Sequence, residues 1–385
     1  MGEDRLRVGI LGVGGIGETH FEAIRRVGGV DVVAIARRNE ESLREYAGRH
    51  GIPKVYTEWR DLVDDDAVQV VVVCTPNGSH YEHVSYALEK NRYVVVDKPL
   101  AIGVEQTSGL VRAASEKKLG HALTYNHRFI PLIFQMREMV RRGELGKITY
   151  IKAHALGDFM LAIDEIAPDH WRTRPETVGW SRTMSVMGGH LLDLLYFITG
   201  ERVKEVFSDF GYVNPAKPPF GFDGEKAVLG DEGQMEDHVG LLMRLGEGIK
   251  GSVVLSEAAP GHKVEVFVEV IGTKQCVSWN LQKINEMWIG RMTEPNGVLY
   301  KGFDLLHEEA QAVCAPPAWG QDGFSESFRQ LYASIFQSFR EKRHLQGVRP
   351  EFADFFDGHY MELVLRAMLR SSRTDTWQTV GFVEP

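Results

Sequence analysis

The chain begins with a short apolar run that leads directly into a glycine-rich turn, RVGILGVGGIGE, at residues 7–18. The glycines of its GxGxxG pattern are Gly12, Gly14 and Gly17. The first permits a tight turn out of a strand, the second lets the backbone approach a pyrophosphate, and the third lets the next helix pack on the sheet. The N–H groups that start such a helix attract phosphates. The pattern therefore predicts a dinucleotide site.

The residues around this turn have the pattern of a strand–helix–strand unit. Val8–Leu11 predicts a strand, the apolar spacing of Glu18–Val27 predicts a helix, and Val30–Ala36 predicts a second strand. A βαβ unit of about 30 residues is the setting in which GxGxxG binds a dinucleotide. The alternative, a glycine turn with a purely structural role, is disfavoured by this setting. We expect Gly15 and Ile16, inside the turn, to contact the cofactor as well.

Length and composition indicate a folded protein of two domains. The chain has 385 residues, a formal net charge of −9 and a pI near 5.9. Nucleic acids and anionic membranes need a basic footprint, which the sequence lacks. The three cysteines, at positions 74, 276 and 314, have no metal-binding or disulfide-like spacing. We therefore expect no metal and, without a secretory leader or a membrane-length apolar run, a cytoplasmic protein.

The pattern of predicted elements changes once along the chain. Residues 1–123 alternate strands and helices, which is typical of a doubly wound parallel α/β (Rossmann) domain. Residues 124–385 have the pattern of an α+β domain for substrate binding and oligomerisation, with a large, mostly antiparallel open sheet and an apolar helix over Gly188–Thr199. The last segment, 350–385, contains a predicted helix, Phe352–Arg370, and either stays with this domain or packs back on the first.

Polar residues follow two of the predicted parallel strands, at the edge where such sheets bind ligands. The sequence CTPNGSH, residues 74–80, follows one strand, and DKP, residues 97–99, follows the next. A lysine held at a strand end can have its ammonium pKa lowered by partial burial, which suits Lys98 to proton transfer. The alternative is a solvated lysine beside a turn proline.

A histidine and an aspartate share one face of the predicted helix in the second domain. His190 and Asp193 are three positions apart, so their side chains are neighbours on a helix. Histidine titrates near neutral pH and relays protons, and Asp193 is expected to orient it or to bind a hydroxyl. The alternative is a histidine satisfied inside a helix–sheet interface.

These landmarks resemble the Gfo/Idh/MocA family of NAD(P)-dependent sugar and polyol oxidoreductases, in that family's order and across nearly the whole chain. The landmarks are GxGxxG, Cys74-Thr75-Pro76-Asn77 with His80, Asp97-Lys98-Pro99-Leu100-Ala101, Tyr125-Asn126-His127-Arg128-Phe129, Trp171-Arg172 and Gly189-His190-x-x-Asp193. The resemblance implies a Rossmann domain and a second domain whose open sheet covers the active site and forms a homodimer or homotetramer.

The same resemblance implies roles for individual residues. Lys98 would exchange a proton with the substrate hydroxyl while hydride passes to the nicotinamide, and His190 would share this acid/base work. The residues implied at a sugar or polyol substrate are Lys98, Tyr125, Asn126, His190 and Asp193. Besides the glycine-rich turn, those implied at the cofactor are Thr75, Pro76, Asn77, His80, Lys98, Trp171 and Arg172.

Two departures from the family pattern matter. Many members carry an aspartate four residues before the helix histidine, where this chain has Val186; we hypothesise that Asp193 compensates in part. NAD enzymes normally end the second strand with an acid that binds the ribose diol and repels a 2′-phosphate. Here the strand is followed by Arg37 and Arg38, which suit a phosphate dianion. We predict NADP as the preferred cofactor, with NAD use through other contacts as the alternative.

Three functions stay open. The first is an oxidoreductase for a secondary hydroxyl, or its ketone, of a sugar, anhydrosugar, glycoside or polyol. Residues 279–291, with Trp288, resemble members that oxidise anhydrosugars or the C3 hydroxyl of glycosides. The second is a nicotinamide-dependent glycosidase, in which transient C3 oxidation permits elimination without net redox change. The third is a cofactor-binding regulator, which Val186 favours and the retention of Lys98 and His190 disfavours.

Overall fold

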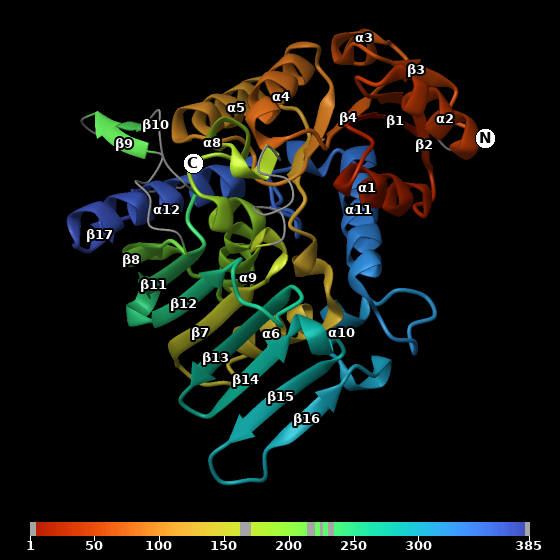
Figure 1. The fold of residues 1–385 in the computed structure, drawn as a ribbon. Helices are drawn as coiled ribbons and strands as arrows, with labels where there is room; N and C mark the ends of the chain where they lie inside the picture. Colours follow the sequence, from red (N-terminus) through yellow and green to blue (C-terminus); the bar gives the residue numbers. More distant parts are fainter. Residues whose placement is uncertain (1–4, 162–170, 214–219, 224–225, 230–234, 382–385) are drawn as a thin grey trace. The chain divides into compact units, whose positions relative to one another are not determined.

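The computed structural model describes residues 5–161, 171–213, 220–223, 226–229 and 235–381 (Figure 1). Its internal contacts divide the chain into two units. The first unit is Met1–Asn126 with Phe324–His359, and the second is His127–Gly323 with Tyr360–Pro385.

The first unit is built on a six-stranded parallel sheet with the order β3-β2-β1-β4-β5-β6. Its strands are β1 (Leu6–Leu11), β2 (Val30–Ala36), β3 (Lys54–Tyr56), β4 (Val70–Val73), β5 (Tyr93–Val96) and β6 (His121–Leu123). Its helices before the sheet's last strand are α1 (Ile16–Arg25), α2 (Glu40–His50), α3 (Trp59–Asp64), α4 (His80–Glu89) and α5 (Val104–Lys117). The strand order reverses between β1 and β4, the point at which such sheets bind dinucleotides. The predicted Rossmann architecture is confirmed.

Helix α11 (Phe324–Arg340) joins the first unit from far along the chain and packs against α1. Its buried face includes Phe328 and Tyr332, and both rings meet the buried side chain of His20 edge-on. The sequence predicts a single domain boundary at residue 123, whereas the contacts place α11 with the first unit. The apolar face of this helix needs an apolar partner, and α1 supplies it. Helix α12 (Phe355–Thr374) crosses the division between the units, so residues 350–385 are shared between them.

The second unit contains a nine-stranded sheet with the order β16-β15-β14-β13-β7-β12-β11-β8-β17. Only β7 and β12 pair in parallel among these neighbours, which confirms the predicted mostly antiparallel open sheet. The strands are β7 (Ile148–Leu156), β8 (Val203–Gly211), β11 (His238–Leu245), β12 (Lys250–Ser256), β13 (Glu265–Gly272), β14 (Gln275–Asn280), β15 (Glu286–Arg291), β16 (Gly297–Tyr300) and β17 (Gln378–Thr379). A separate hairpin pairs β9 (Phe220–Asp223) with β10 (Lys226–Leu229).

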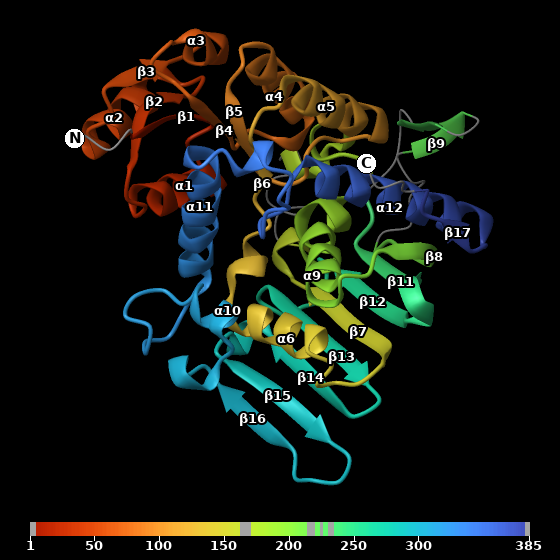
Figure 2. The same cartoon turned by 180° about the vertical axis from the view of Figure 1, so that it is seen from behind.

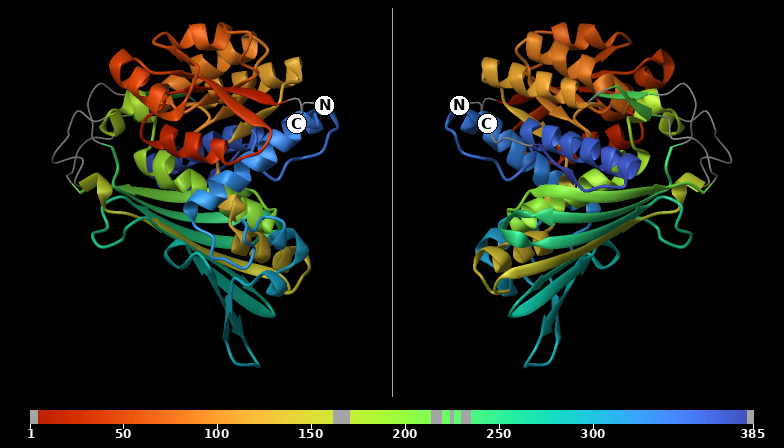
Figure 3. Two further views of the ribbon diagram at one scale, coloured as in Figure 1. Left: turned by 90° about the vertical axis from the view of Figure 1, so that its right-hand side faces the viewer. Right: turned by 90° about the vertical axis from the view of Figure 1, so that its left-hand side faces the viewer.

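Helices α6 (Pro131–Arg141) and α9 (Gly189–Thr199) cover one face of this sheet (Figures 1 and 2). The other face carries no helix in the described part of the chain (Figure 3). Strand pairing places one continuous row of side chains on that open face: Leu242, Ser252, Lys152, Glu269, Ser278, Trp288 and Val298. The alternating residues Leu241 and Met287 are buried on the helical side.

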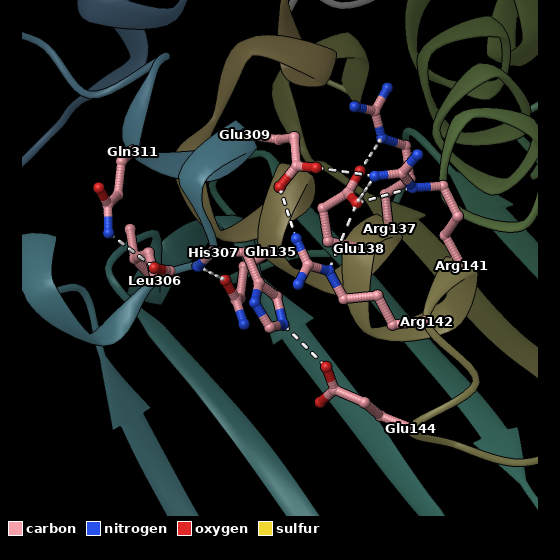
Figure 4. Close-up of polar contacts among 10 residues, drawn as sticks. All are labelled: Gln135, Arg137, Glu138, Arg141, Arg142, Glu144, Leu306, His307, Glu309 and Gln311. Carbon is pink, nitrogen blue, oxygen red and sulfur yellow. Dashed lines mark hydrogen bonds and ion pairs between the residues drawn. The ribbon is translucent and has the colours of Figure 1, made fainter.

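A charged network attaches the short helix α10 (Glu308–Gln311) to α6 (Figure 4). The guanidiniums of Arg141 and Arg142 donate to Glu309 at 2.7 and 2.9 Å. Beneath them, the buried carboxylate of Glu138 accepts from Arg141 at 2.7 Å. Among the described helices, none combines the length and apolar character needed to cross a membrane.

Candidate functional site

The glycine-rich turn is packed so closely that two of its glycines admit no side chain. A Cβ on Gly12, whose φ is +89°, would lie 2.8 Å from the carbonyl oxygen of Cys74, and a Cβ on Gly17 would lie 2.0 Å from the carbonyl oxygen of Gly12. A Cβ on Gly14 would meet only Arg37 Cζ, at 4.0 Å. Gly15 precedes α1 and provides no side-chain cap, while the N–H groups of Gly17 and Glu18 donate to the carbonyls of Gly14 and Gly15 at 3.0 and 3.3 Å. The start of this helix remains the predicted contact of a pyrophosphate.

Two arginines follow β2, and the first of them lies beside the glycine-rich turn. Both Arg37 and Arg38 are exposed, and neither side chain has a hydrogen bond or ion pair within the described residues. The Arg37 backbone N–H donates to the carbonyl of Tyr56 at 3.1 Å, while its guanidinium extends to within 4.0 Å of the Cβ position of Gly14. Two uncompensated positive charges therefore lie where β2 ends.

The residues after β4 meet the turn that holds Lys98. Nδ1 and Nε2 of the fully buried His80 lie 2.7 Å from the Pro99 carbonyl oxygen and 2.8 Å from the Thr75 carbonyl oxygen. Burial lowers the pKa of His80, and the hydrogen bonds to the Pro99 and Thr75 carbonyls, together with the Asp97 carboxylate, oppose this shift. His80, expected at the cofactor, is thus occupied in joining two loops, while Pro76 and the buried Asn77 lie in the loop before it.

Lys98 stands half-buried at the end of β5, between Asp97 and Pro99. The Thr124 hydroxyl donates to Asp97 Oδ1 at 2.9 Å, and His20 Nε2 lies 3.4 Å from the same oxygen. Burial by itself would raise the pKa of Asp97, but His20, Lys98 and His80 more than offset it and hold that pKa below its usual range. The lysine therefore lies beside a permanent carboxylate.

In the second unit, His190 lies in a segment that is otherwise packed away. Every residue from 181 to 195 is buried except Val186 and His190, which are four positions apart. They are separated by the end of a π-helical turn, Met184–Gly188, which leads into α9. The aspartate position of the family pattern and the histidine therefore open to one side, as that pattern requires, but this chain presents a valine there.

Asp193 is placed differently from the expectation. Its two carboxylate oxygens accept from Arg128 Nε and Nη2 at 2.8 and 2.5 Å, and both side chains are buried. The neighbouring His127 stacks on His190, with ring centroids 4.6 Å apart. Consecutive residues of the turn Asn126–Phe129 thus each meet one of the two helix residues. The motif containing His127 and Arg128 was visible in the sequence, but their partners were not.

The two residues expected at a sugar, Tyr125 and Asn126, are also buried. Asn126 donates from Nδ2 to the Ser327 hydroxyl at 2.7 Å, so its amide links β6 to α11. In the second unit, the guanidinium of Arg172 lies over the Trp171 ring, 4.5 Å from its centroid. These four residues remain predicted ligand contacts.

The two tryptophans near residue 280 lie on opposite faces of the sheet, because Trp279 pairs with the buried Met287 and Trp288 pairs with Ser278 on the open face. Trp279 is core, and its Nε1 donates to the Ile284 carbonyl at 3.0 Å. Trp288 faces the open side, opposite the neighbouring Met287. Trp288 therefore does not share a face with α9 and His190. Within the described ranges, no cluster of three or more His, Cys, Asp or Glu side chains is arranged to hold a metal.

Comparisons with known proteins agree with this architecture. Residues 6–126 match a family described as "Oxidoreductase family, NAD-binding Rossmann fold", and residues 133–278 match the "GFO/IDH/MocA C-terminal domain". The chain is 25% identical to levoglucosan dehydrogenase of Pseudarthrobacter phenanthrenivorans over 97% of this chain and 98% of that protein. It is 26% identical to myo-inositol 2-dehydrogenase of Thermotoga maritima over 70% and 73% of the two chains.

The fold is likewise similar to that of an inositol dehydrogenase homologue from Azotobacter vinelandii complexed with NAD⁺. The TM-score is 0.85 and the identity is 24%, with 98% of this chain and 97% of the other covered.

The buried ion pair with Arg128 implies a structural role for Asp193, and replacing Asp193 tests this role against a chemical one. We expect Asp193→Asn to lower the free energy of unfolding by about 3–5 kcal/mol, because it leaves the Arg128 charge buried without its carboxylate. The double replacement Arg128→Met with Asp193→Leu should recover most of that loss and retain measurable turnover. Chemical denaturation and steady-state kinetics would check both. Unchanged stability in Asp193→Asn, with turnover abolished, would contradict the structural role.

Proposed function

We propose a specific chemistry for this chain, which belongs to the GFO/IDH/MocA family of oxidoreductases with an NAD-binding Rossmann fold. It transfers hydride between NADP and a secondary hydroxyl, or the corresponding ketone, of a sugar, anhydrosugar, glycoside or polyol. Lys98 and His190 move the proton. The named relatives support the substrate class, since they include levoglucosan and inositol dehydrogenases.

One observation carries the choice of NADP: the Arg37 guanidinium lies next to Gly14 with no described ion-pair partner. A carboxylate at this position would accept from the ribose diol and repel a 2′-phosphate. A guanidinium does the opposite, because it donates bidentate, charge-assisted hydrogen bonds to phosphate. Arg38, also exposed, adds a second positive charge.

Replacing one arginine tests this assignment. We expect Arg37→Gln to lower kcat/KM for NADP⁺ by about 10- to 100-fold and to leave that for NAD⁺ within a few fold, since a charge-assisted hydrogen bond is worth about 1.5–3 kcal/mol. The matched control is Arg44→Gln, which removes an exposed arginine paired with Glu40 on α2. Equal losses for the two cofactors, or higher wild-type efficiency with NAD⁺, would refute the assignment.

The proton-transfer role of Lys98 is supported by how its turn is held. The bound dinucleotide would supply the hydride acceptor at its nicotinamide. His80 links the Pro99 carbonyl to the loop after β4, and Thr124 holds Asp97, so the lysine is fixed at the ligand-binding edge of the sheet. His190 is the half-exposed group of the second unit suited to share the proton. Asp193 we reassign to positioning, through Arg128.

Loss of the lysine should affect chemistry more than cofactor binding. We expect Lys98→Met to reduce kcat by about 10²- to 10⁴-fold, the usual contribution of a general acid or base. His190→Gln should also reduce kcat, and both proteins should still bind NADP⁺ in a calorimetric titration. Lys90→Met, at a surface lysine paired with Asp64, is the control. A Lys98→Met enzyme that keeps more than about a tenth of wild-type kcat would exclude this role.

Product analysis separates the net oxidoreductase from a glycosidase that oxidises its substrate transiently. Purified protein is incubated with NADP⁺ and a panel of anhydrosugars, glycosides and polyols, and both reduced nicotinamide and carbohydrate products are measured. We expect NADPH and ketone in equal amounts. Glycoside cleavage without NADPH would favour the glycosidase, and the absence of turnover on every substrate would favour a cofactor-binding regulator.

We further propose a homodimer or homotetramer in the cytoplasm. The open face of the nine-stranded sheet supports assembly, because it exposes Leu242 and Val254, which are 47% and 51% accessible, together with Val298 and Tyr300 at the other end of the sheet. A second copy is the simplest cover for such a row. The acidic composition and the scarcity of cysteine support a reducing compartment.

A further inference from the structure

Two buried histidines contact the two residues that flank Lys98 in the sequence. One of them contacts only backbone atoms, and the other contacts side chains. His80 contacts the carbonyl of Pro99, the residue after the lysine. His20, on α1, faces the side chain of Asp97, the residue before it. The lysine turn is therefore held from the helix that begins at the glycine-rich turn as well as from α4.

The partners of His20 select one arrangement of its protons. Nδ1 lies 2.6 Å from the Tyr332 hydroxyl on α11, and Nε2 lies 3.4 Å from Asp97 Oδ1, which is longer than a normal N–H···O hydrogen bond. An ionised carboxylate only accepts, whereas a phenol can donate. The arrangement that suits both partners has the Tyr332 O–H donating to Nδ1 and the Nε2–H directed at Asp97.

Tyr332 is suited to remain a donor. Its side chain is fully buried, and its ring stacks on that of Phe336. Burial, with smaller contributions from Cys74 and Asp97, raises the pKa of Tyr332 well above its ordinary value. The hydroxyl therefore stays protonated wherever the enzyme is folded and active, and it keeps His20 in a single orientation.

Asp97 is surrounded by titratable groups from several elements. They are His20 on α1, His80 on α4, Tyr332 on α11, Cys74 after β4 and Lys98 in its own turn. Burial raises the pKa of Asp97, and the contact with His20 is the largest influence that lowers it again. Without His20, the carboxylate loses its main compensation for burial.

We propose that His20, oriented by Tyr332, is a positioning residue for Lys98: it fixes Asp97 as a carboxylate beside the lysine and ties the lysine turn to helix α1. The inference rests on the proposed proton-transfer role of Lys98. It also assigns a role to α11 in the first unit, because this helix carries the Tyr332 hydroxyl that orients His20. It also links proton transfer to the helix whose start faces the cofactor phosphates.

The electrostatic consequence has a definite sign. A carboxylate next to Lys98 favours the ammonium form of the lysine. The neutral amine, which accepts a proton from an alcohol, therefore forms only at higher pH. Removing that negative charge favours the neutral amine. The acid limb of the pH profile for alcohol oxidation should then move to lower pH.

Three single variants and two controls test the sign. We expect Asp97→Asn and His20→Phe to move the acid limb of kcat/KM by about one pH unit to lower pH, and Tyr332→Phe to move it less. The double variant of His20 and Asp97 should shift no further than Asp97→Asn, because the two act through one interaction. The controls are His121→Phe, at a histidine stacked on Phe355, and Tyr46→Phe, whose hydroxyl has no described partner. They should retain the wild-type profile.

A second readout needs neither cofactor nor turnover. In the cofactor-free protein labelled with ¹⁵N-histidine, the resonance missing from His20→Phe should show a ring that is protonated at Nε2 and accepts at Nδ1. Tyr332→Phe, which loses one oxygen, should give a mixture of tautomers. Tyr332→Phe also keeps the test valid if His20→Phe does not fold, because the resonance whose tautomer changes in Tyr332→Phe is then assigned to His20.

The outcomes separate this inference from the proposed function. A His20 ring protonated at Nδ1, or wild-type pH profiles in both Asp97→Asn and Tyr332→Phe, overturns the positioning role even if Lys98→Met shows its expected loss of kcat. Full activity of Lys98→Met instead overturns the proposed function, and with it the kinetic role of His20, whatever the tautomer is.

Discussion

The close approach of three backbone segments at Gly12 is the constraint on which the rest of the first unit depends. Strand β1 ends, helix α1 begins and the loop after β4 passes within 2.8 Å of where a Cβ on Gly12 would lie. Only glycine allows this contact, and Gly17 allows the helix to follow. Once α1 is placed there, its next turn brings His20 within 3.4 Å of Asp97, and Gly14 lies beside Arg37.

The sequence predicted elements best where the pattern was long and the turn chemistry clear. Strand β2 matches its predicted bounds, and the helix predicted over Gly188–Thr199 begins one residue before α9 and ends with it. Strand β3 and helix α11 were not predicted. Strand β3 has three half-exposed residues, which is too few for alternation to register. Helix α11 has a strong amphipathic pattern, but nothing local indicates that its partner is α1.

At the candidate site, the sequence likewise predicted which residues carry reactive groups but not which partners those groups contact. The motifs identified the chemistry-bearing residues, yet His80, Asn126 and Asp193 each contact a protein group: the Pro99 carbonyl, Ser327 and Arg128. Such pairings join segments far apart in the chain, and one sequence contains no record of them. Val186 is the reverse case: its position is open, as the family pattern requires, but its side chain brings no charge. Lys98 and His190 are accordingly the two groups to which we assign the proton.

The most direct test of the account is a calorimetric titration of the wild-type protein with NADP⁺ and with NAD⁺ at two ionic strengths. If Arg37 and Arg38 receive a 2′-phosphate, NADP⁺ should bind at least about tenfold more tightly, a difference of about 1.4 kcal/mol. That advantage should shrink in high salt, because both arginines are exposed and screened. Equal affinity, or tighter binding of NAD⁺ at both ionic strengths, would contradict the account.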